Sequence, residues 1–403
     1  MGRNVPQLRF PEFTAEWEEK TLGDIGKFRK GKLVSSSNVT DSGVPAMMYG
    51  DIYVKYNIDF DSVDYRVSEE MAENCVKIHK GDLLFTCSGE TDIDIAKCVC
   101  YTGSDEVCIG GDILALTPEK DDSLFVAQHQ NTYKTAVQKA RVSQGHSVVH
   151  IYEQQLSALP IHLPCKEEQE KISQFLSKYD KLIRNQEEKI SALKERKQGL
   201  LKKIFTQQVR FKDQDGNDYP AWEEKKLGDY AIINPKTETL ADEFYYIDLE
   251  SVETGNLNLK DAIEKENAPS RAQRVLSLND VLFQTVRPYQ KNHLHYTEIF
   301  DKQVVASTGY AQMRVEKGDN RFLYQLLYTD KFNYDVNLRC TGSNYPAINS
   351  SELSAIRVTI PCEEEQKKIA DVLSAFDKKI EVEQEILNNM QEFKKGLLQK
   401  MFI

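Results

Sequence analysis

An internal repeat constrains the fold of this chain more than any other feature of its sequence. The segment WEEKTLGD at residues 17–24 returns as WEEKKLGD at residues 222–229. Further along, LSALPIHLPC at 156–165 returns as LSAIRVTIPC at 353–362. The longest match aligns the 41 residues from Cys165 with those from Cys362 without a gap, and 19 of these 41 positions are identical. Such self-similarity predicts two copies of one structural scaffold.

Each copy ends in a segment with the period of a coiled coil. Between residues 165 and 205, and again between 362 and 402, apolar side chains recur at alternating spacings of four and three residues. A 3.5-residue period over several heptads predicts a long helix that needs a partner helix. The nearest partner of equal length is the other copy, so we expect the two helices to pair antiparallel. The residues expected in this pairing are Ile172, Leu176, Ile183, Ile190, Leu193, Leu200, Ile369, Leu373, Ile380, Leu387 and Leu397.

The segments that precede the two helices are predicted to be mixed α/β domains. Strand-like runs stand at residues 82–87, 112–117, 281–286 and 310–315, and helical runs at 123–140 and 320–333. The expected fold is therefore α+β, in which two mixed α/β domains alternate with two long helices as a pseudo-two-fold internal repeat. The expected boundaries are an N-terminal arm at 1–20, domains at 21–164 and 210–361, and helical segments at 165–209 and 362–403.

Composition limits the class of protein. The 403 residues carry a formal net charge of −11 and contain no run of about 18 apolar residues, which a membrane-spanning helix requires. The N-terminus lacks the apolar segment of a secretory signal, so a cytoplasmic location is expected. None of the eight cysteines forms a CxxC pair, and we expect reduced thiols.

Each catalytic or metal-binding motif that the sequence suggests lacks a required residue. Residues 26–33 nearly form a phosphate-binding loop, but Leu33 stands where a magnesium-binding hydroxyl is needed, so a basic surface loop is expected instead. Lys236 interrupts a methyltransferase-like motif that begins at Asn234. His293 and His295 have no third ligand at zinc-site spacing, and packing explains them better. We predict no catalytic residue, metal site or cofactor in this chain.

Features typical of nucleic-acid binding gather where the two copies differ. Arg, Asn and Gln side chains, which pair with base edges, follow a repeated strand at residues 285–293, and basic residues precede a serine cluster at 27–37. An ordinary solvated charge run explains the second group equally well. The residues predicted to bind DNA are Arg29, Lys30, Lys32, Ser35, Ser36, Ser88, Thr91, Lys97, Arg141, His146, Ser147, Lys236, Thr237, Arg271, Arg274, Arg287, Tyr289, Gln290, Lys291, Asn292, Arg339, Ser343, Asn344 and Tyr345.

The acidic net charge does not extend over the whole chain. Residues 178–212 contain eleven Lys or Arg and four acidic residues, a local charge of +7, whereas residues 363–403 contain nine acidic residues and seven Lys, a charge of −2. A basic helix is usually a solvated surface. This one joins the two predicted domains, so it also offers charge near a nucleic-acid partner.

In combination, these motifs resemble the specificity subunit of type I restriction–modification systems. The resemblance rests on the two WEEKxLGD blocks, on Glu168-Gln169 and Glu365-Gln366 at the start of the helices, and on GLLxKxF at their ends. The family usually has a second proline where this chain has Cys165 and Cys362. The resemblance covers nearly the whole chain.

The resemblance implies two target-recognition domains, each reading one half of a split, asymmetric double-stranded DNA site, with the paired helices setting the gap. It also implies a non-catalytic chain that assembles with two methyltransferase and two restriction/translocase subunits. S-adenosylmethionine, ATP and magnesium would then belong to those partners, and no membrane is involved. A rival interpretation is a coiled-coil adaptor whose two domains bind proteins and not DNA.

Overall fold

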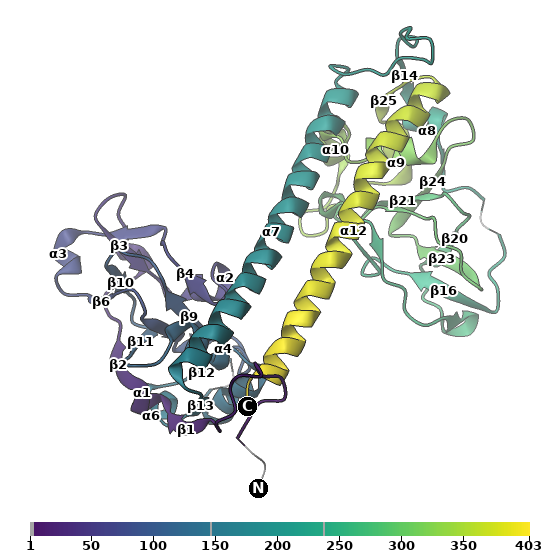
Figure 1. The fold of residues 1–403 in the computed structure, drawn as a ribbon. Coiled ribbons are helices and arrows are strands. Elements are labelled where there is room, and N and C mark those ends of the chain that lie inside the picture. Colours follow the sequence, from purple (N-terminus) through teal and green to yellow (C-terminus); the bar gives the residue numbers. More distant parts are fainter. Residues whose placement is uncertain (1–3, 146, 237) are drawn as a thin grey trace. The chain divides into compact units, whose positions relative to one another are not determined.

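The computed structural model describes residues 4–145, 147–236 and 238–403, which form two compact units (Figure 1). Unit 1 comprises the described residues up to Glu187 together with Ile386–Ile403, and unit 2 comprises Glu188–Glu385. Each unit therefore contains one globular domain and a part of each long helix, α7 (Lys166–Phe205) and α12 (Glu363–Met401). None of the helices in these described ranges is long and apolar enough to cross a membrane.

The domain of unit 1 is built from two sheets. The larger has the order β2 (Gly26–Lys30), β11 (Ile113–Pro118), β7 (Leu83–Thr86), β9 (Cys98–Tyr101), β4 (Asp59–Phe60). The smaller has the order β5 (Tyr65–Val67), β3 (Val44–Met47), β10 (Val107–Ile109), β6 (Val76–Ile78). Two ribbons, β1 (Glu18–Thr21) with β13 (Pro160–Leu163) and β8 (Ser88–Gly89) with β12 (Val149–His150), complete the strands. The helices are α1 (Leu22–Ile25), α2 (Tyr49–Val54), α3 (Glu69–Ala72), α4 (Ser123–Gln130), α5 (Tyr133–Val142) and α6 (Glu153–Ser157).

The domain of unit 2 repeats this plan with different strand pairings. One sheet has the order β15 (Ile232–Ile233), β24 (Tyr310–Arg314), β21 (Val281–Gln284), β22 (Leu294–His295), and the other β19 (Ile263–Glu264), β16 (Glu243–Ile247), β23 (Gln303–Ser307), β20 (Ala272–Val275). The ribbons are β14 (Glu223–Lys226) with β25 (Arg357–Ile360) and β17 (Val252–Glu253) with β18 (Asn256–Leu257). The helices are α8 (Leu227–Tyr230), α9 (Asn320–Leu326), α10 (Asp330–Arg339) and α11 (Ser350–Ser354).

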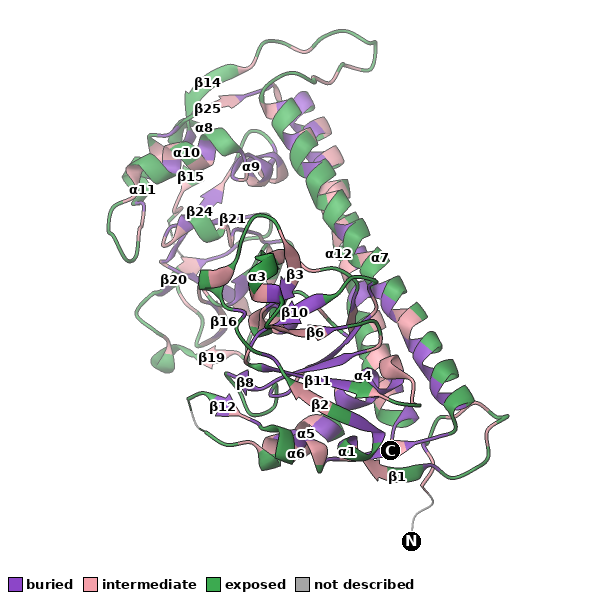
Figure 2. Ribbon diagram, turned by 90° about the vertical axis from the view of Figure 1, so that its left-hand side faces the viewer, coloured by how far each residue is buried: buried purple, intermediate pink, exposed green. Residues whose placement is uncertain are grey.

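The strands alternate their apolar side chains between two cores. In β7, Leu83 and Phe85 pack toward α4 and the long helices, whereas Leu84 packs toward the smaller sheet. In β21, Phe283 packs toward α9 and the long helices, whereas Leu282 packs toward the sheet that contains β16 and β23. This two-residue period explains why both strands are continuously apolar in the sequence, because both of their faces are buried (Figure 2).

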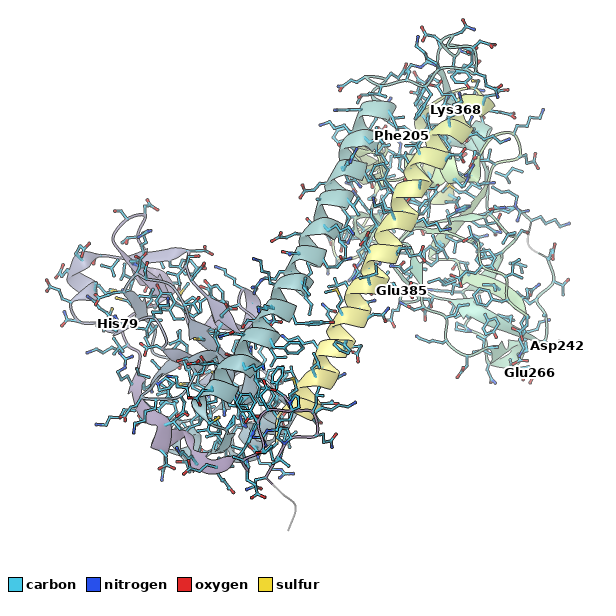
Figure 3. The ribbon with its side chains drawn as sticks, viewed as in Figure 1. His79, Phe205, Asp242, Glu266, Lys368 and Glu385 are labelled. Carbon is cyan, nitrogen blue, oxygen red and sulfur yellow. The ribbon has the colours of Figure 1, made fainter. Side chains whose placement is uncertain are left out.

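Each long helix ends inside the core of a globular domain. In unit 1, the ring of Phe402, which directly follows α12, lies 5.3 Å from Phe125 and 6.4 Å from Trp17. In unit 2, the ring of Phe205 lies 5.3 Å from Phe322 and 5.9 Å from Trp222 (Figure 3). The three aromatic positions correspond in the repeat, so the end of one long helix completes the core of the domain that precedes the other.

The helices pair antiparallel, as the sequence predicts. In unit 1, Lys394 of α12 forms an ion pair with Asp180 of α7. In unit 2, Lys197 Nζ lies 2.5 Å from Asp377 Oδ1, which is the same pair in the other copy. A polar pair inside an apolar seam favours a single register of the two helices.

Most residues expected in the helix pairing are buried. Ile172, Leu176, Ile183, Ile190, Ile369, Leu373, Leu387 and Leu397 are buried, and Leu193, Leu200 and Ile380 are partly exposed. The stripe of buried positions along α7 and α12 is visible in Figure 2.

The repeated motifs at both helix starts form one polar cluster in each unit. Glu168 accepts hydrogen bonds of 2.7 Å from Arg9 Nε and Nη2, and Glu365 accepts bonds from Arg210 and from Trp222 Nε1. The neighbouring Gln169 donates to the carbonyl of Pro164 at 3.0 Å. The cluster fastens the segment before each WEEKxLGD block to the first turn of a long helix.

Two predictions about local structure are wrong. Residues 26–33 are not a surface loop, because residues 26–30 form β2. A Cβ on Gly26 would lie 2.2 Å from the carbonyl oxygen of Thr117, so this glycine permits strand pairing and does not bind phosphate. The expected helical runs 123–140 and 320–333 are each two helices, because the hydroxyl groups of Thr132 and Thr329 cap a new helix in the middle of the run.

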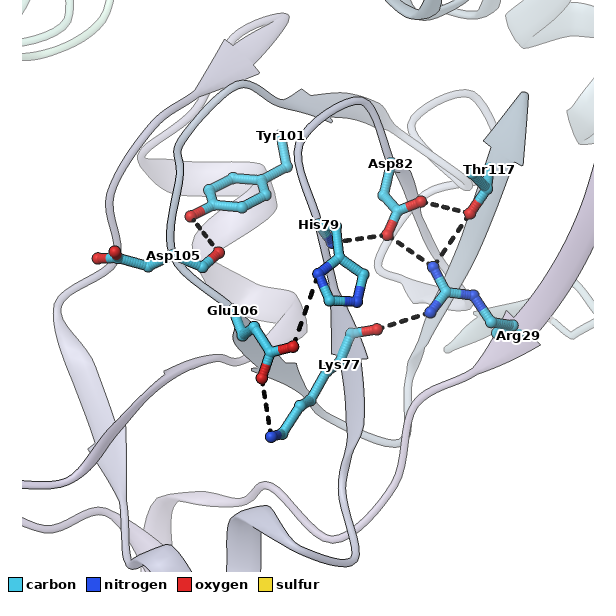
Figure 4. A network of polar contacts seen from close by, with 8 residues as sticks. All are labelled: Arg29, Lys77, His79, Asp82, Tyr101, Asp105, Glu106 and Thr117. Atoms are coloured by element: carbon cyan, nitrogen blue, oxygen red, sulfur yellow. Dashed lines mark hydrogen bonds and ion pairs between the residues drawn. The ribbon is translucent and has the colours of Figure 1, made fainter. Parts of the chain in front are cut away.

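Each domain contains a buried aspartate that is paired with an arginine, and this arginine comes from a different strand in each domain. In unit 1, Asp82 accepts a 2.6 Å hydrogen bond from Arg29 Nη2 of β2 and a bond from the Thr117 hydroxyl (Figure 4). In unit 2, the corresponding Asp280 accepts bonds of 2.7 and 2.9 Å from Arg314, which occupies the repeat position of Thr117. The scaffold requires a cation at this place, and the two copies supply it differently.

We expect Glu365→Leu to lower the free energy of unfolding by about 3 kcal/mol, because it leaves Arg210 partly buried without its carboxylate. Denaturation in urea measures the loss. Glu364→Leu, at the exposed neighbouring position, is the control and should change stability by less than about 0.5 kcal/mol. Equal losses in the two variants would contradict a specific role for the cluster.

We expect Arg29→Met to lower the free energy of unfolding by about 2 kcal/mol, because Asp82 would remain buried without a cation. The exposed neighbour Lys30→Met should have little effect on stability. Thermal unfolding followed by circular dichroism distinguishes the two. A stable Arg29→Met variant would show that the contact with Asp82 is dispensable.

Candidate nucleic-acid interface

In unit 1, the structure brings together two loops that the repeat does not share. The loop after β7 contains β8, and the loop after α5 contains β12; the two strands pair antiparallel with Val149 opposite Gly89. The Ser88 hydroxyl lies 3.0 Å from His150 Nδ1. The two loops therefore lie side by side where β8 and β12 pair.

In unit 2, the equivalent loops meet in the same way. Val286 and Ala347 form an antiparallel bridge, and the backbone N–H of Arg287 donates to the carbonyl of Pro346 at 2.7 Å. The bridge lies at the repeat position of the β8–β12 pair. Both domains thus hold two divergent loops together by backbone hydrogen bonds, which leave the side chains free to differ.

An arginine and two tyrosines dominate the surface of the unit 2 loops. The guanidinium carbon of Arg287 lies 4.3 Å from the centroid of the Tyr345 ring, a cation–π contact between the two loops. Tyr289 and Tyr345 are 56% and 65% exposed, so both rings are accessible to a partner. Arg287 has a positive φ of 52°, so the backbone turns sharply at this residue.

Three side-chain amides at the end of β21 and in the following loop form hydrogen bonds within this region. Gln284 Nε2 donates to Gln290 Oε1 at 2.8 Å, and Gln284 Oε1 accepts the backbone N–H of Asn292 at 3.1 Å. The side chain of Asn292 in turn accepts the backbone N–H of Thr254 at 3.1 Å. These contacts order the loop from inside and fix the position of Arg287 and Tyr289.

The residues predicted to bind DNA differ in exposure. Those with exposed side chains are Lys30, Lys32, Ser35, Ser36, Thr91, Arg141, Ser147, Lys236, Arg271, Tyr289, Gln290, Ser343, Asn344 and Tyr345. Those that are partly buried are Arg29, Lys97, Arg274, Arg287, Lys291, Asn292 and Arg339, and Ser88 is buried. His146 and Thr237 lie outside the described residues.

Several of the partly buried residues are used inside the domains. Arg29 binds Asp82, and Arg339 donates to the Asp335 carbonyl at 2.7 Å. Lys97 Nζ donates to the carbonyl of Tyr56 at 2.6 Å, and burial lowers the pKa of this lysine. Contact of any of these residues with DNA stays a prediction.

Two residues that the sequence did not single out contribute to the loops of unit 1. His150 binds Ser88, and the Tyr53 hydroxyl donates to the Ser88 carbonyl at 3.0 Å while accepting a bond from Thr86. Both contacts join segments more than 30 residues apart, so no local sequence signal indicated them.

His293, which the sequence offered as a weak metal-ligand candidate, has the contacts of a core residue. Its ring stacks on Phe283 with 4.5 Å between centroids, and its Nδ1 accepts the backbone N–H of Gln284 at 3.1 Å. Burial lowers the pKa of His293 to about 3, so the ring is neutral. Within the described part of the chain, no three His, Cys, Asp or Glu side chains are grouped to hold a metal ion.

Comparisons with known proteins agree with this arrangement. The family model for the type I restriction modification DNA specificity domain matches residues 14–195 and 219–392. Two specificity subunits of Methanocaldococcus jannaschii type I restriction enzymes, those of MjaX and MjaVIII, are 27% and 25% identical to the chain. The alignments cover 98% and 97% of this chain and 95% and 92% of theirs.

Solved structures share the fold. The S subunit of a type I restriction–modification system from M. genitalium aligns with a TM-score of 0.60 at 15% identity and covers 99% of both chains. A chain from a study of complex assembly in the type I R-M system aligns with a TM-score of 0.56 at 15% identity and covers 96% of this chain and 97% of that one.

The family model matches both halves of the chain, and these halves are the two repeats that the sequence and the fold share. The chain belongs to the family of type I restriction–modification DNA specificity subunits.

Proposed function

We propose that each globular domain reads one half of a split, asymmetric double-stranded DNA site. The observation that carries this proposal is the pair of divergent loops held at the same place in both domains, by β8–β12 in unit 1 and by the Val286–Ala347 bridge in unit 2. Because the two domains share a scaffold but carry different side chains in these loops, they are suited to bind two half-sites of different sequence. Arg287, Tyr289 and Tyr345 supply a guanidinium and aromatic rings, which are groups that bind base edges and phosphates.

We further propose that the paired helices set the gap between the half-sites and serve as a scaffold. Two methyltransferase subunits and two restriction/translocase subunits would assemble on this chain, which itself contributes no catalytic group. S-adenosylmethionine, ATP and magnesium would be bound by those subunits. The local charge of +7 over residues 178–212 supports a position of this helix close to DNA, and a cytoplasmic location is part of the same proposal.

The proposed function is tested by sequencing methylated adenine in DNA from cells that produce this chain with a methyltransferase subunit encoded beside it. We expect a split, asymmetric methylated motif that is absent when this chain is omitted. The same methylation with and without this chain, when both proteins are folded, would instead support a protein-binding adaptor.

Replacing Arg287 by Ala should relax base preference in one half-site only. The loss of a bidentate base contact costs about 1–3 kcal/mol, so the preference should fall by roughly tenfold or more. Tyr345→Ala should have a smaller effect in the same half, because it frees the guanidinium from its stacking partner. Methylation rates on a panel of altered half-sites measure both effects. Lys317→Ala, an exposed lysine outside the loops, is the matched control for lost positive charge.

Removing one heptad from both helices should shorten the gap without altering either half-site. The pairs Asp180–Lys394 and Lys197–Asp377 fix the register, so deletion of residues 184–190 must be matched by deletion of 384–390. The methylated motif of the variant measures the gap. Altered half-site sequences would contradict the division between reading domains and spacing helices.

A further inference from the structure

A cavity of about 980 Å³ in unit 1 is lined by an unusual number of lysines. It lies between the first turn of α5, the segment around Lys97 and the C-terminal end of α12. Five lysines contribute to its walls, namely Lys97, Lys134, Lys139, Lys394 and Lys395, and Asp94 is the one acidic side chain in the same lining. Lys394 is paired with Asp180. In a chain of net charge −11, such a lining indicates a site for an anion.

Lys139 is the most unusual of these residues. Its side chain is buried, and its Nζ donates to the carbonyl oxygens of Ala96 and Gln130, both at 2.6 Å. Among the described residues, no carboxylate forms an ion pair with it. Burial lowers its pKa to about 8. An ammonium group has three N–H donors, and besides the two carbonyls the Lys139 ammonium lies 5.8 Å from the centroid of the Phe85 ring, so no described oxygen or nitrogen takes its third donor.

The second copy of the repeat shows that the fold does not need this lysine. The position of Lys139 in α5 corresponds to Val336 in α10, which is buried in the core of unit 2. An apolar side chain therefore occupies this place in the second copy. Lys139, with its hydrogen bonds to Ala96 and Gln130, is a feature of unit 1 alone.

Three further polar groups of cavity-lining residues have no hydrogen-bond partner among the described residues. The backbone N–H groups of Tyr133 and Lys134 open α5, and the described chain supplies no acceptor for either, because the Thr132 hydroxyl caps Thr135 instead. Gln130 is fully buried and contributes to the lining, and its Oε1 has no hydrogen-bond partner among the described residues. The buried acceptor of Gln130 is normally satisfied by a donor, which a ribose hydroxyl or a base amino group of a bound molecule would supply.

We propose that this cavity binds a nucleotide, with its phosphate held by Lys134, Lys139 and the first turn of α5. Helix N-termini and lysines are common phosphate-binding groups. Tyr53 and Tyr133 also line the cavity, and their rings offer a surface for the base. The nucleotide is either free in solution or part of a bound DNA strand. The second source rests on the proposed function, whereas the first is independent of it.

Calorimetric titration of the full chain with ATP and with pyrophosphate tests the site. We expect saturable binding of both, and weakening by roughly tenfold or more in Lys139→Met and in Lys134→Ala. Lys331→Ala, which replaces the counterpart of Lys134 in unit 2, should bind as the wild type does. Lys134 is exposed, so its variant remains informative if Lys139→Met unfolds. Absence of saturable binding by the wild type, or equal weakening by the control, would overturn the proposal.

Competition with a labelled duplex distinguishes the two sources. If ATP displaces the duplex, and the Lys134 and Lys139 variants bind the duplex more weakly, the phosphate belongs to DNA. If ATP binds without affecting the duplex, the ligand is a free nucleotide. ATP binding to the cavity does not require that the chain recognise DNA bases. Failure of the methylation experiment and failure of the ATP titration can therefore be told apart.

Discussion

The structure depends on the contact between each long helix and the domain that it does not follow. The end of α12 supplies Phe402 to the core of unit 1, and the end of α7 supplies Phe205 to the core of unit 2. Neither core is complete without that aromatic ring. The helices must therefore run antiparallel, and the pairs Asp180–Lys394 and Lys197–Asp377 stabilise the register that brings both rings into place.

The two copies share a scaffold but satisfy its polar requirements in separate ways. Asp82 and Asp280 occupy the same position, yet the first is neutralised by Arg29 of β2 and the second by Arg314 of β24. Both solutions work because a buried carboxylate requires a nearby cation, and its origin in the chain is unimportant. The same freedom lets the loops after β7 and β21 diverge, since the backbone pairing that the two copies share does not depend on their side chains.

In the structure, the residues predicted to bind DNA in the segment 285–293 have different roles. The sequence indicated Arg, Gln and Asn in the segment 285–293, and the structure places that segment beside Tyr345. Gln290 and Asn292 form hydrogen bonds that shape the loop, Arg287 is partly buried against Tyr345, and Tyr289 is exposed at the loop surface. This division follows from hydrogen bonds between loops far apart in the chain, which residue types alone do not reveal.

The repeat and its heptad spacing determined the two long helices, and with them the family and the antiparallel pairing, although α7 ends at Phe205 and not at the expected residue 209. Those features depend on local periodicity, which a sequence displays directly. The tertiary structure alone decided that residues 26–30 form a strand, that Thr132 and Thr329 divide the helical runs, and that Arg29 faces Asp82. It also placed Lys139 in a cavity where the other copy has Val336. Such outcomes depend on which distant side chains meet in the folded chain, and burial decides whether a charge needs a partner.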